Sequence, residues 1–340
     1  MEINEKLNLI KRNTCEVLTN QELVSLINTK EHPSAYIGTA ITGRPHIGYF
    51  CWAQKLADFS KAGIKSQILL ADIHGALDNT PWNFLEKRYE YYKIVISSMI
   101  ETMGGDLDDI EIIRGSSYQL NKDFVMDLYK LSSIVSIRNA TKASSDVIKA
   151  KENPVISGLI YPLIQILDEQ YLDVDIQLGG TDQRKIMVLA REVLPKLGYK
   201  PRIEIMFPLM KGLTQDGKMS SSIQNSKIDL LDDFETIQKK LNTAYCPEGD
   251  IDNGVLDFAK RIIMTQKQDN HEEFIIDRPQ KWGGPLSFKT SEDLEKAFVS
   301  KELHPLDLKN GLATEIDKLL SPIRQKMKGK ESLLKDAGYE

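Results

Sequence analysis

The stretch ITGRPHIGYF, residues Ile41–Phe50, follows the short apolar run SAYIG and precedes apolar residues at three- and four-residue spacing. Pro45 fixes its own φ and disfavours a helical conformation of the preceding residue, so we expect a helix to begin near Pro45 or His46. The apolar spacing gives that helix one buried face. The sequence here predicts a strand, a tight turn and a helix, which together form the repeating unit of an α/β fold.

The N-terminus of this predicted helix has two possible roles. Its free N–H groups and partial positive charge suit an anion such as a phosphate. Most turns from a strand into a helix bind nothing, so this stretch alone favours a plain turn and leaves a phosphate site open.

Strands and helices alternate along the first 225 residues. The expected strands are 34–38, 66–74, 110–115, 174–180 and 202–210. Helical patterns cover 4–29, 46–62, 82–103, 122–149, 157–171 and 182–197. This alternation predicts an α/β domain, a Rossmann-like doubly wound parallel sheet covered by helices on both faces. Ligands of such sheets bind beyond the carboxyl ends of the strands, where we expect Tyr36, His74, Gln119 and Gly179.

The pattern changes after residue 225. Helices are expected at 232–244, 255–264, 291–300 and 304–328, with a small strand at 285–288. We therefore predict two domains, residues 1–225 with the parallel sheet and residues 226–340 as a mainly α-helical domain.

Composition narrows the class of protein. The 340 residues carry a net charge of -5, which argues against non-specific binding along nucleic acid. The three cysteines lack CxxC spacing, so neither a disulfide framework nor a zinc site is indicated. The N-terminus lacks a signal peptide, and no apolar run reaches the roughly 20 residues that span a bilayer. We expect a soluble intracellular protein.

Two further stretches carry polar groups in patterns that suggest chemistry. GLTQDGKMSSS, residues 212–222, is either a solvated linker or a loop whose donors close over phosphate, with Lys218 as a mobile charge. Tyr161, Gln165 and Asp168 are spaced to share one face of a helix. After them, GGTDQ at 179–183 predicts a turn where a carboxylate can accept from ribose hydroxyls.

Taken together, TGRPHIGY, KMSSS and YPLIQ..D with GGTDQRKI resemble the class I aminoacyl-tRNA synthetases, specifically tyrosyl-tRNA synthetases of the archaeal and eukaryotic type. The resemblance runs from Lys11 to about Lys326. KMSSS with an upstream HxGx is typical of class I, and the polar set around Asp168 is typical of tyrosine recognition. Tyr49 stands where the HIGH motif has its second histidine, as is common in the eukaryotic-type relatives.

The resemblance implies a tyrosine-tRNA ligase, which joins L-tyrosine to ATP and then transfers the tyrosyl group to tRNA(Tyr). ATP would be a substrate, Mg²⁺ would arrive with it, and no protein metal site is expected. The protein would be a cytoplasmic homodimer that binds neither membrane nor DNA, with residues 226–340 binding the anticodon. No appended domain is expected after the last helix.

The resemblance also implies roles for individual residues. Tyr36 and Asp168 would meet the substrate phenol, Tyr161, Gln165 and Gln183 its α-ammonium, and the rest of the tyrosine pocket would be Leu69, Ala71, His74 and Gln119. His46, Lys218, Ser220, Ser221 and Ser222 would act on the phosphates, and the other ATP contacts would be Gly38, Thr42, Gly48, Gly180, Asp182 and Met219. Trp282 would stack on an anticodon base that Asp307 and His304 hydrogen-bond, whereas the acceptor end would meet Arg184, Lys185 and Lys142.

Three other classes of protein share parts of this pattern. Tryptophanyl-tRNA synthetases share the fold but typically carry KMSAS. A non-catalytic RNA-binding protein derived from a synthetase would be expected to lack His46, Lys218 or Asp168, and all three are present. A nucleotidyltransferase that makes a small metabolite would lack the anticodon-type segments after residue 225.

Overall fold

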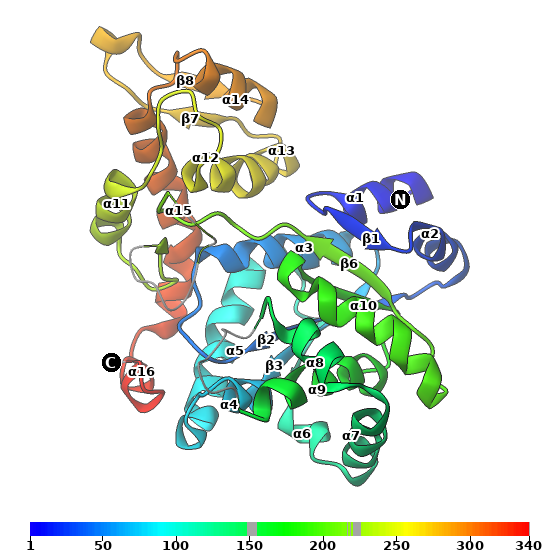
Figure 1. The fold of residues 1–340 in the computed structure, drawn as a ribbon. Helices are drawn as coiled ribbons and strands as arrows, with labels where there is room; N and C mark the ends of the chain where they lie inside the picture. Colours follow the sequence, from blue (N-terminus) through cyan, green and yellow to red (C-terminus); the bar gives the residue numbers. More distant parts are fainter. Residues whose placement is uncertain (148–154, 216, 218, 220–225, 340) are drawn as a thin grey trace.

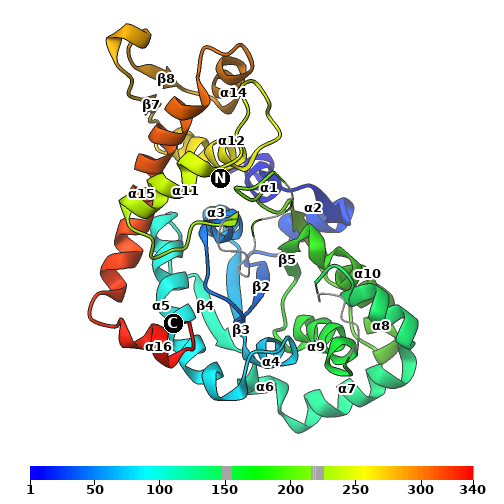
Figure 2. The same cartoon turned by 60° about the vertical axis from the view of Figure 1, so that its left-hand side comes forward.

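The computed structural model describes residues 1–147, 155–215, 217, 219 and 226–339. An α/β part built on one sheet carries a mainly helical part beside it, and the long helix α15 (Pro305–Met327) runs between the two (Figure 1). The helix lies along α5 (Leu85–Thr102), with α16 (Ser332–Asp336) beyond its end (Figure 2). Along the described chain, no helix is both long and apolar enough to cross a membrane.

Six strands form the main sheet in the order β1-β6-β5-β2-β3-β4. They are β1 (Glu16–Leu18), β2 (Ser34–Ala40), β3 (Lys65–Ala71), β4 (Ile110–Arg114), β5 (Ile176–Gly180) and β6 (Ile203–Phe207). All neighbours are parallel except β1, which is antiparallel to β6. The chain proceeds from β2 through β3 to β4 on one side and then places β5 and β6 on the other. The point where the strand order reverses therefore lies between β2 and β5, where such sheets have a ligand crevice.

Helices cover both faces of this sheet. They are α1 (Ile3–Lys11), α2 (Asn20–Thr29), α3 (Phe50–Lys61), α4 (Asp72–Leu77), α5, α6 (Ser116–Gln119), α7 (Lys122–Ile134), α8 (Ile137–Ser144), α9 (Ser157–Tyr171) and α10 (Arg184–Val193). Alternate residues of β3 point to opposite faces, so Ile68 and Leu70 join the core under α3 and α5, while Leu69 and Ala71 face the other side with Tyr36. Periodicity in the strands thus decides which residues reach the crevice.

Several predicted boundaries are wrong. The interval 4–29 holds β1 as well as helices, and this edge strand forms by pairing Val17 with Ile205. The strand expected at 66–74 ends at Ala71, so His74 lies in α4 instead of at a strand end. The strand expected at 202–210 ends at Phe207. Up to residue 147, where the described part of the helical pattern 122–149 ends, the chain forms two helices, because Ser136 caps the start of α8.

The helix expected from Pro45 or His46 also begins later. A 3₁₀ turn, η1 (Ile47–Tyr49), comes first, and α3 starts at Phe50. His46 is the N-cap of this turn, and its Nδ1 accepts from the Gly48 N–H. Three similar short turns occupy the ends of the predicted helices 82–103 and 182–197. They are η2 (Trp82–Phe84), η3 (Thr181–Gln183) and η4 (Leu194–Leu197).

The second part is mainly helical, as predicted. Its elements are α11 (Phe234–Thr243), α12 (Gly254–Phe258) continuing through the π-helical η6 (Ala259–Met264) into α13 (Thr265–Asp269), β7 (Phe274–Ile276), η7 (Gln280–Trp282), β8 (Leu286–Phe288), α14 (Ser291–Val299), α15 and α16. The small strand expected near 285–288 is present as β8, and its antiparallel partner β7 was not predicted.

The two parts share one continuous core. The rings of Phe50 on α3 and Phe258 on α12 meet edge to face with centroids 6.3 Å apart. Arg12, just after α1, forms ion pairs with both Asp58 on α3 and Asp269 on α13. Aromatic pairs and bidentate ion pairs of this kind restrict sliding of one element on another, so the helical part is packed firmly against the sheet part.

Candidate active site

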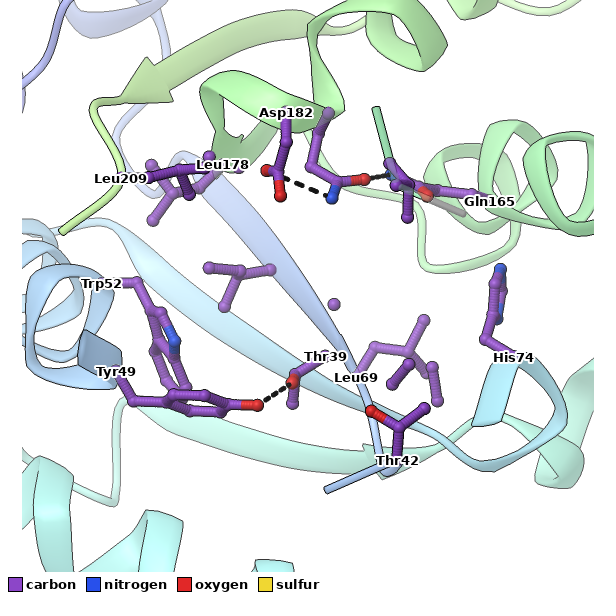
Figure 3. Close-up of a pocket in the computed structure, with 18 of the residues that line it drawn as sticks. Thr39, Thr42, Tyr49, Trp52, Leu69, His74, Gln165, Leu178, Asp182 and Leu209 are labelled. Carbon is purple, nitrogen blue, oxygen red and sulfur yellow. Dashed lines mark hydrogen bonds between the residues drawn. The ribbon is translucent and has the colours of Figure 1, made fainter. Parts of the chain in front are cut away.

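A cavity of about 610 Å³ opens at the carboxyl ends of β2 and β5, at the predicted crevice. Its walls come from β2 and the loop after it, from β3, α4, α9, β5 and η3, and from Phe207, Leu209, Met210 and Met219. Most residues implied for tyrosine and ATP line it: Tyr36, Gly38, Thr42, His46, Gly48, Leu69, Ala71, His74, Tyr161, Gln165, Asp168, Gly180, Asp182, Gln183 and Met219. In Figure 3, Asp182 and Gln165 lie on one side of the cavity, and Thr39, Thr42 and Tyr49 lie opposite.

Asp168 on α9 is the charged group at the closed end of the cavity. Its side chain is fully buried, and its Oδ1 accepts from the Tyr118 hydroxyl at 2.7 Å and from Gln119 Nε2 at 2.8 Å. Its Oδ2 has no hydrogen-bond partner among the described residues, and His74 Nε2 is 3.9 Å away. Burial raises the pKa of Asp168 to about 7, although the hydrogen bonds from Gln119 and Tyr118 oppose the shift. Gln119 thus lies behind Asp168 and not on the cavity wall.

Two further polar side chains, Tyr36 and His74, line the cavity near Asp168. Tyr36 is buried on β2, and burial raises the pKa of its phenol well above the usual range. Burial lowers the pKa of His74 to about 4, so His74 is neutral at pH 7, and neither ring nitrogen has a partner in the described structure. Leu69 and Ala71 supply apolar wall beside them. A buried polar atom without a partner is rare in native proteins, so this end of the cavity matches a ligand that is apolar with one hydrogen-bonding group.

Amide and carboxylate oxygens line the next part of the cavity. Gln165 Nε2 donates to Gln183 Oε1 at 3.1 Å, and Gln183 Nε2 donates to Asp182 Oδ1 at 3.3 Å (Figure 3). Tyr161 on α9 lies near them, with its ring edge-on to His74 at a centroid distance of 4.5 Å. This chain of acceptors suits a cation such as an α-ammonium group.

His46 lies in the turn between β2 and α3, directly before η1. Because its Nδ1 accepts from the Gly48 N–H at 3.2 Å, the neutral ring carries its hydrogen on Nε2. Burial, and secondarily the charge of Lys227, lowers the pKa of His46 to about 3. A Cβ on Gly48 would lie 2.8 Å from His46 Cε1, so only glycine leaves room for this ring. His46 therefore offers a neutral N–H donor at the cavity wall.

The segments on both sides of the KMSSS serines lie against this turn. The Ile47 N–H donates to the Ile228 carbonyl at 2.9 Å, and Arg44 forms an ion pair with Asp229 at 2.8 Å. Met219 lines the cavity, and its N–H donates to the Met210 carbonyl at 3.0 Å. Lys218, Ser220, Ser221 and Ser222 lie outside the described residues.

Comparison with known proteins identifies the family. The family described as tRNA synthetases class I (W and Y) matches residues 28–321. The chain is 48% identical to the cytoplasmic tyrosine-tRNA ligase of Saccharomyces cerevisiae over 95% of this chain and 84% of that protein. It is 40% identical to the tyrosine-tRNA ligase of Haloarcula marismortui over 99% of this chain and 98% of that protein.

A crystal structure of tyrosyl-tRNA synthetase complexed with L-tyrosine from Archaeoglobus fulgidus is similar with a TM-score of 0.89 at 39% identity, over 96% of this chain and 100% of that one. This chain belongs to the tyrosyl-tRNA synthetase family. The comparisons confirm the predicted family, fold class and activity, the ligation of tyrosine to tRNA. A tryptophanyl-tRNA synthetase from Aeropyrum pernix, with a TM-score of 0.71 at 14% identity, shares the fold alone.

The residues that the family resemblance assigned to the anticodon lie outside the cavity, in the helical part. Trp282 in η7 is 65% exposed, and Lys281 Nζ is 5.5 Å from its ring centroid. His304 caps α15 by accepting from the Leu306 N–H at 3.1 Å. Arg278 joins the two loops, because it donates to the carbonyl of Gly284 at 2.6 Å and to that of Glu302 at 2.9 Å.

The residues assigned to the acceptor end of the tRNA lie near β1 and α8. Arg184 forms an ion pair with Glu16 at 2.7 Å, and Lys185 pairs with Asp146 at 2.7 Å. Lys142 is exposed on α8. These cations are on the surface of the sheet part.

Sequence reasoning missed several residues of the cavity. Behind the cavity wall, Tyr118 is the second donor to Asp168, and its only sequence signal is that it precedes Gln119. Tyr49 and Trp52 form part of the wall, where the Tyr49 hydroxyl lies 3.4 Å from Thr39 Oγ1. Gln177 also lines the cavity, and a polar residue in the otherwise apolar run of β5 was a signal that went unused.

Proposed function

We propose that this cavity binds L-tyrosine with its phenol between Tyr36 and Asp168, and binds ATP along His46, Gly48 and the turn at Asp182. The observation that carries the proposal is the fully buried Oδ2 of Asp168 at the closed end of the cavity, which has no hydrogen-bond partner among the residues that the structure describes. A phenol hydroxyl would give this oxygen its partner. Phenylalanine would leave it desolvated and unpaired, which is the principle of selectivity for which tyrosyl-tRNA synthetases are the standard example.

The α-ammonium end of the bound tyrosine would meet the row of amide and carboxylate oxygens on the cavity wall. Gln165, Gln183 and Tyr161 would hold the α-ammonium group, and Asp182 would accept from the ribose hydroxyls. Their supporting observation is the continuous row of hydrogen bonds from Gln165 to Asp182 on one wall.

The chemical step needs no protein nucleophile. A carboxylate oxygen of tyrosine attacks the α-phosphorus, the new P–O bond forms as the bond to pyrophosphate breaks, and tyrosyl-adenylate results. The His46 Nε2–H would donate to a phosphate oxygen, and Lys218 with Ser220, Ser221 and Ser222 would neutralise the leaving pyrophosphate. Catalysis is therefore mainly positioning and stabilisation of charge. We assign Mg²⁺ to the phosphates of ATP, its usual ligands in such reactions.

Transfer to tRNA(Tyr) would use the second part of the chain. We propose that residues 1–225 form the catalytic domain and residues 226–340 the anticodon-binding domain. Trp282 would stack on an unpaired base while Asp307 and His304 read its edge, a common mode of RNA recognition. The exposure of Trp282 supports this role. Arg184, Lys185 and Lys142 would approach the acceptor end.

We also propose that the protein is a cytoplasmic homodimer. The relative from Saccharomyces cerevisiae is named cytoplasmic. Helices α7 and α8 expose large apolar side chains, namely Met126, Tyr129, Ile134 and Ile137, at 47%, 65%, 42% and 73%. Exposed apolar groups gathered on one pair of helices are typical of a protein interface.

Exchange of labelled pyrophosphate into ATP tests the substrate assignment. We expect exchange that depends on tyrosine and that is weaker by orders of magnitude with phenylalanine. Tryptophan serves as the control for the sister family. Exchange with tryptophan in place of tyrosine would overturn the assignment, and exchange with phenylalanine at the tyrosine rate would overturn the role of Asp168 and Tyr36.

A further inference from the structure

A row of polar side chains crosses the middle of the sheet, where parallel sheets are normally apolar. Tyr36 of β2 is in register with Gln67 of β3 on one side and with Gln177 of β5 on the other, and Gln177 is in register with Glu204 of β6. Residues in register on neighbouring strands point to the same face. These four side chains therefore lie on one face, the face that also carries Leu69 and Ala71.

Gln177 connects Tyr36 to two buried carboxyl groups. With its amide oriented so that each atom meets a suitable partner, its oxygen accepts from the Tyr36 hydroxyl at 3.0 Å. Its nitrogen donates to Glu204 Oε2 at 3.2 Å and to Glu169 Oε1 at 2.5 Å. Glu169 follows Asp168 on α9, and both glutamates are fully buried. The amide of Gln177 on β5 is therefore held by one carboxyl group from β6 and one from α9.

The two carboxyl groups determine the orientation of that amide. Each offers Gln177 an acceptor oxygen, so turning the amide over would place its oxygen against two acceptors and leave the Tyr36 hydroxyl facing a donor. Burial raises the pKa of both Glu169 and Glu204 well above the usual range, so the pair can retain a proton and avoid two adjacent buried charges. The Gln177 oxygen therefore stays directed at Tyr36.

We propose that Gln177, held by Glu169 and Glu204, is a positioning residue that fixes the Tyr36 hydroxyl and thereby sets the discrimination between tyrosine and phenylalanine. The Tyr36 hydroxyl lies 3.0 Å from the Gln177 oxygen and 3.5 Å from the Gln165 carbonyl, so Gln177 is the nearer of its two acceptors and holds the hydroxyl in one position. A substrate phenol that donates its own hydrogen to Asp168 can accept from the Tyr36 hydroxyl held in this position, whereas phenylalanine offers no acceptor. Without Gln177 the Tyr36 hydroxyl can turn to the Gln165 carbonyl, away from the phenol. The proposal rests on the proposed assignment of Tyr36 to the substrate phenol.

A double-mutant cycle tests this role. The variants are Gln177→Leu, Tyr36→Phe and the combination, and the measurement is the ratio of kcat/KM for tyrosine to that for phenylalanine in pyrophosphate exchange. We expect Gln177→Leu to lower this ratio by about tenfold, the size of one hydrogen bond of about 1.4 kcal/mol, with the KM for ATP unchanged. In the Tyr36→Phe background the Gln177 substitution should have no further effect, because interacting sites are not additive.

Gln67→Leu is the matched control. Gln67 is the neighbour of Tyr36 on the opposite strand of the same row, yet it makes no hydrogen bond to Tyr36 in the described structure. Its substitution should leave the ratio unchanged. Gln177→Asn is the second variant in case Gln177→Leu, which strips two buried carboxyl groups of their donor, does not fold. The shortened amide keeps a donor near the glutamates but withdraws from Tyr36, and the same loss of discrimination is expected.

The outcomes separate this inference from the assignment of the tyrosine site. Suppose first that Tyr36→Phe lowers the ratio. Additive effects of the two substitutions would then overturn the role of Gln177, as would the lack of any effect of Gln177→Leu or Gln177→Asn, and the site itself would stay intact. An unchanged ratio in Tyr36→Phe overturns the assignment of Tyr36 itself. An effect of Gln67→Leu equal to that of Gln177→Leu would show a general response of the sheet and would also overturn the role of Gln177.

Discussion

Replacing Asp168 by asparagine is expected to weaken activation of tyrosine while it stabilises the fold. Asparagine has the same shape, and its oxygen can still accept from Tyr118 and Gln119. Its NH₂ group would replace the unpartnered Oδ2, so the substrate phenol would lose an acceptor. A hydrogen bond to a charged group contributes about 1.5–3 kcal/mol, which corresponds to a loss of roughly 10- to 150-fold in kcat/KM for tyrosine.

The effect on stability has the opposite sign. Burial raises the pKa of Asp168 from 3.8 to about 7 in the folded protein. At pH 8 the ionised carboxyl therefore lowers the free energy of unfolding by about 4 kcal/mol, from about three pKa units at about 1.4 kcal/mol each. Below the unfolded-state pKa the carboxyl is protonated in both states and the effect vanishes. The variant should gain stability relative to the native chain as pH rises from about 4 to 7, and then keep that gain.

Two measurements check this prediction, pyrophosphate exchange with tyrosine and urea unfolding between pH 5 and 8. Asp127→Asn is the matched control, because Asp127 also accepts from tyrosine hydroxyls, those of Tyr171 and Tyr199, but lies outside the cavity and its pKa is lowered. That control should lose stability at pH 8 and keep its KM for tyrosine. A variant at Asp168 with unchanged kcat/KM for tyrosine, or with lower stability at pH 8, would refute the reasoning.

Three further predictions test the remaining assignments. Gly48→Ala should raise the KM for ATP about tenfold and leave that for tyrosine unchanged, because the new methyl group displaces the His46 ring; equal changes in both would show a general distortion. Trp282→Ala should keep pyrophosphate exchange but lower tRNA charging by roughly 10- to 100-fold, since a stacked base contributes about 1–3 kcal/mol, and Arg278→Met should act in the same direction by releasing the loop; equal loss of both activities would make Trp282 structural. Ile137→Glu should convert a dimer into monomers in sedimentation experiments, and an unchanged mass would refute the proposed interface.

Local sequence patterns predicted much of this fold. The bounds of α9, 157–171, were predicted correctly because apolar residues recur at helical spacing along the whole helix. Tyr36, His74 and Gly179 were expected near the carboxyl ends of the strands and line the cavity, because a doubly wound sheet brings these ends to one edge. The other expected residues of the cavity were implied by the family resemblance. The place of His74 in a helix and the edge strand β1 were not predictable. Strand β1 forms by pairing with β6, and Asp72, the first residue of α4, is held by Arg114 and Ser116, so both features depend on residues far away in the sequence.

By itself, then, the sequence determined the order of strands and helices, the family and the group of side chains that meet at the crevice, because periodicity and motif spacing are local properties. Only the tertiary structure decided how these side chains act on one another. It placed Tyr118 and Gln119 behind Asp168 and, within the described part of the chain, gave the other carboxyl oxygen no partner. It also set Gln177 between Tyr36 and two buried glutamates. Burial and strand register arise from contacts between distant segments, and these contacts set the protonation and the hydrogen-bond direction of each group.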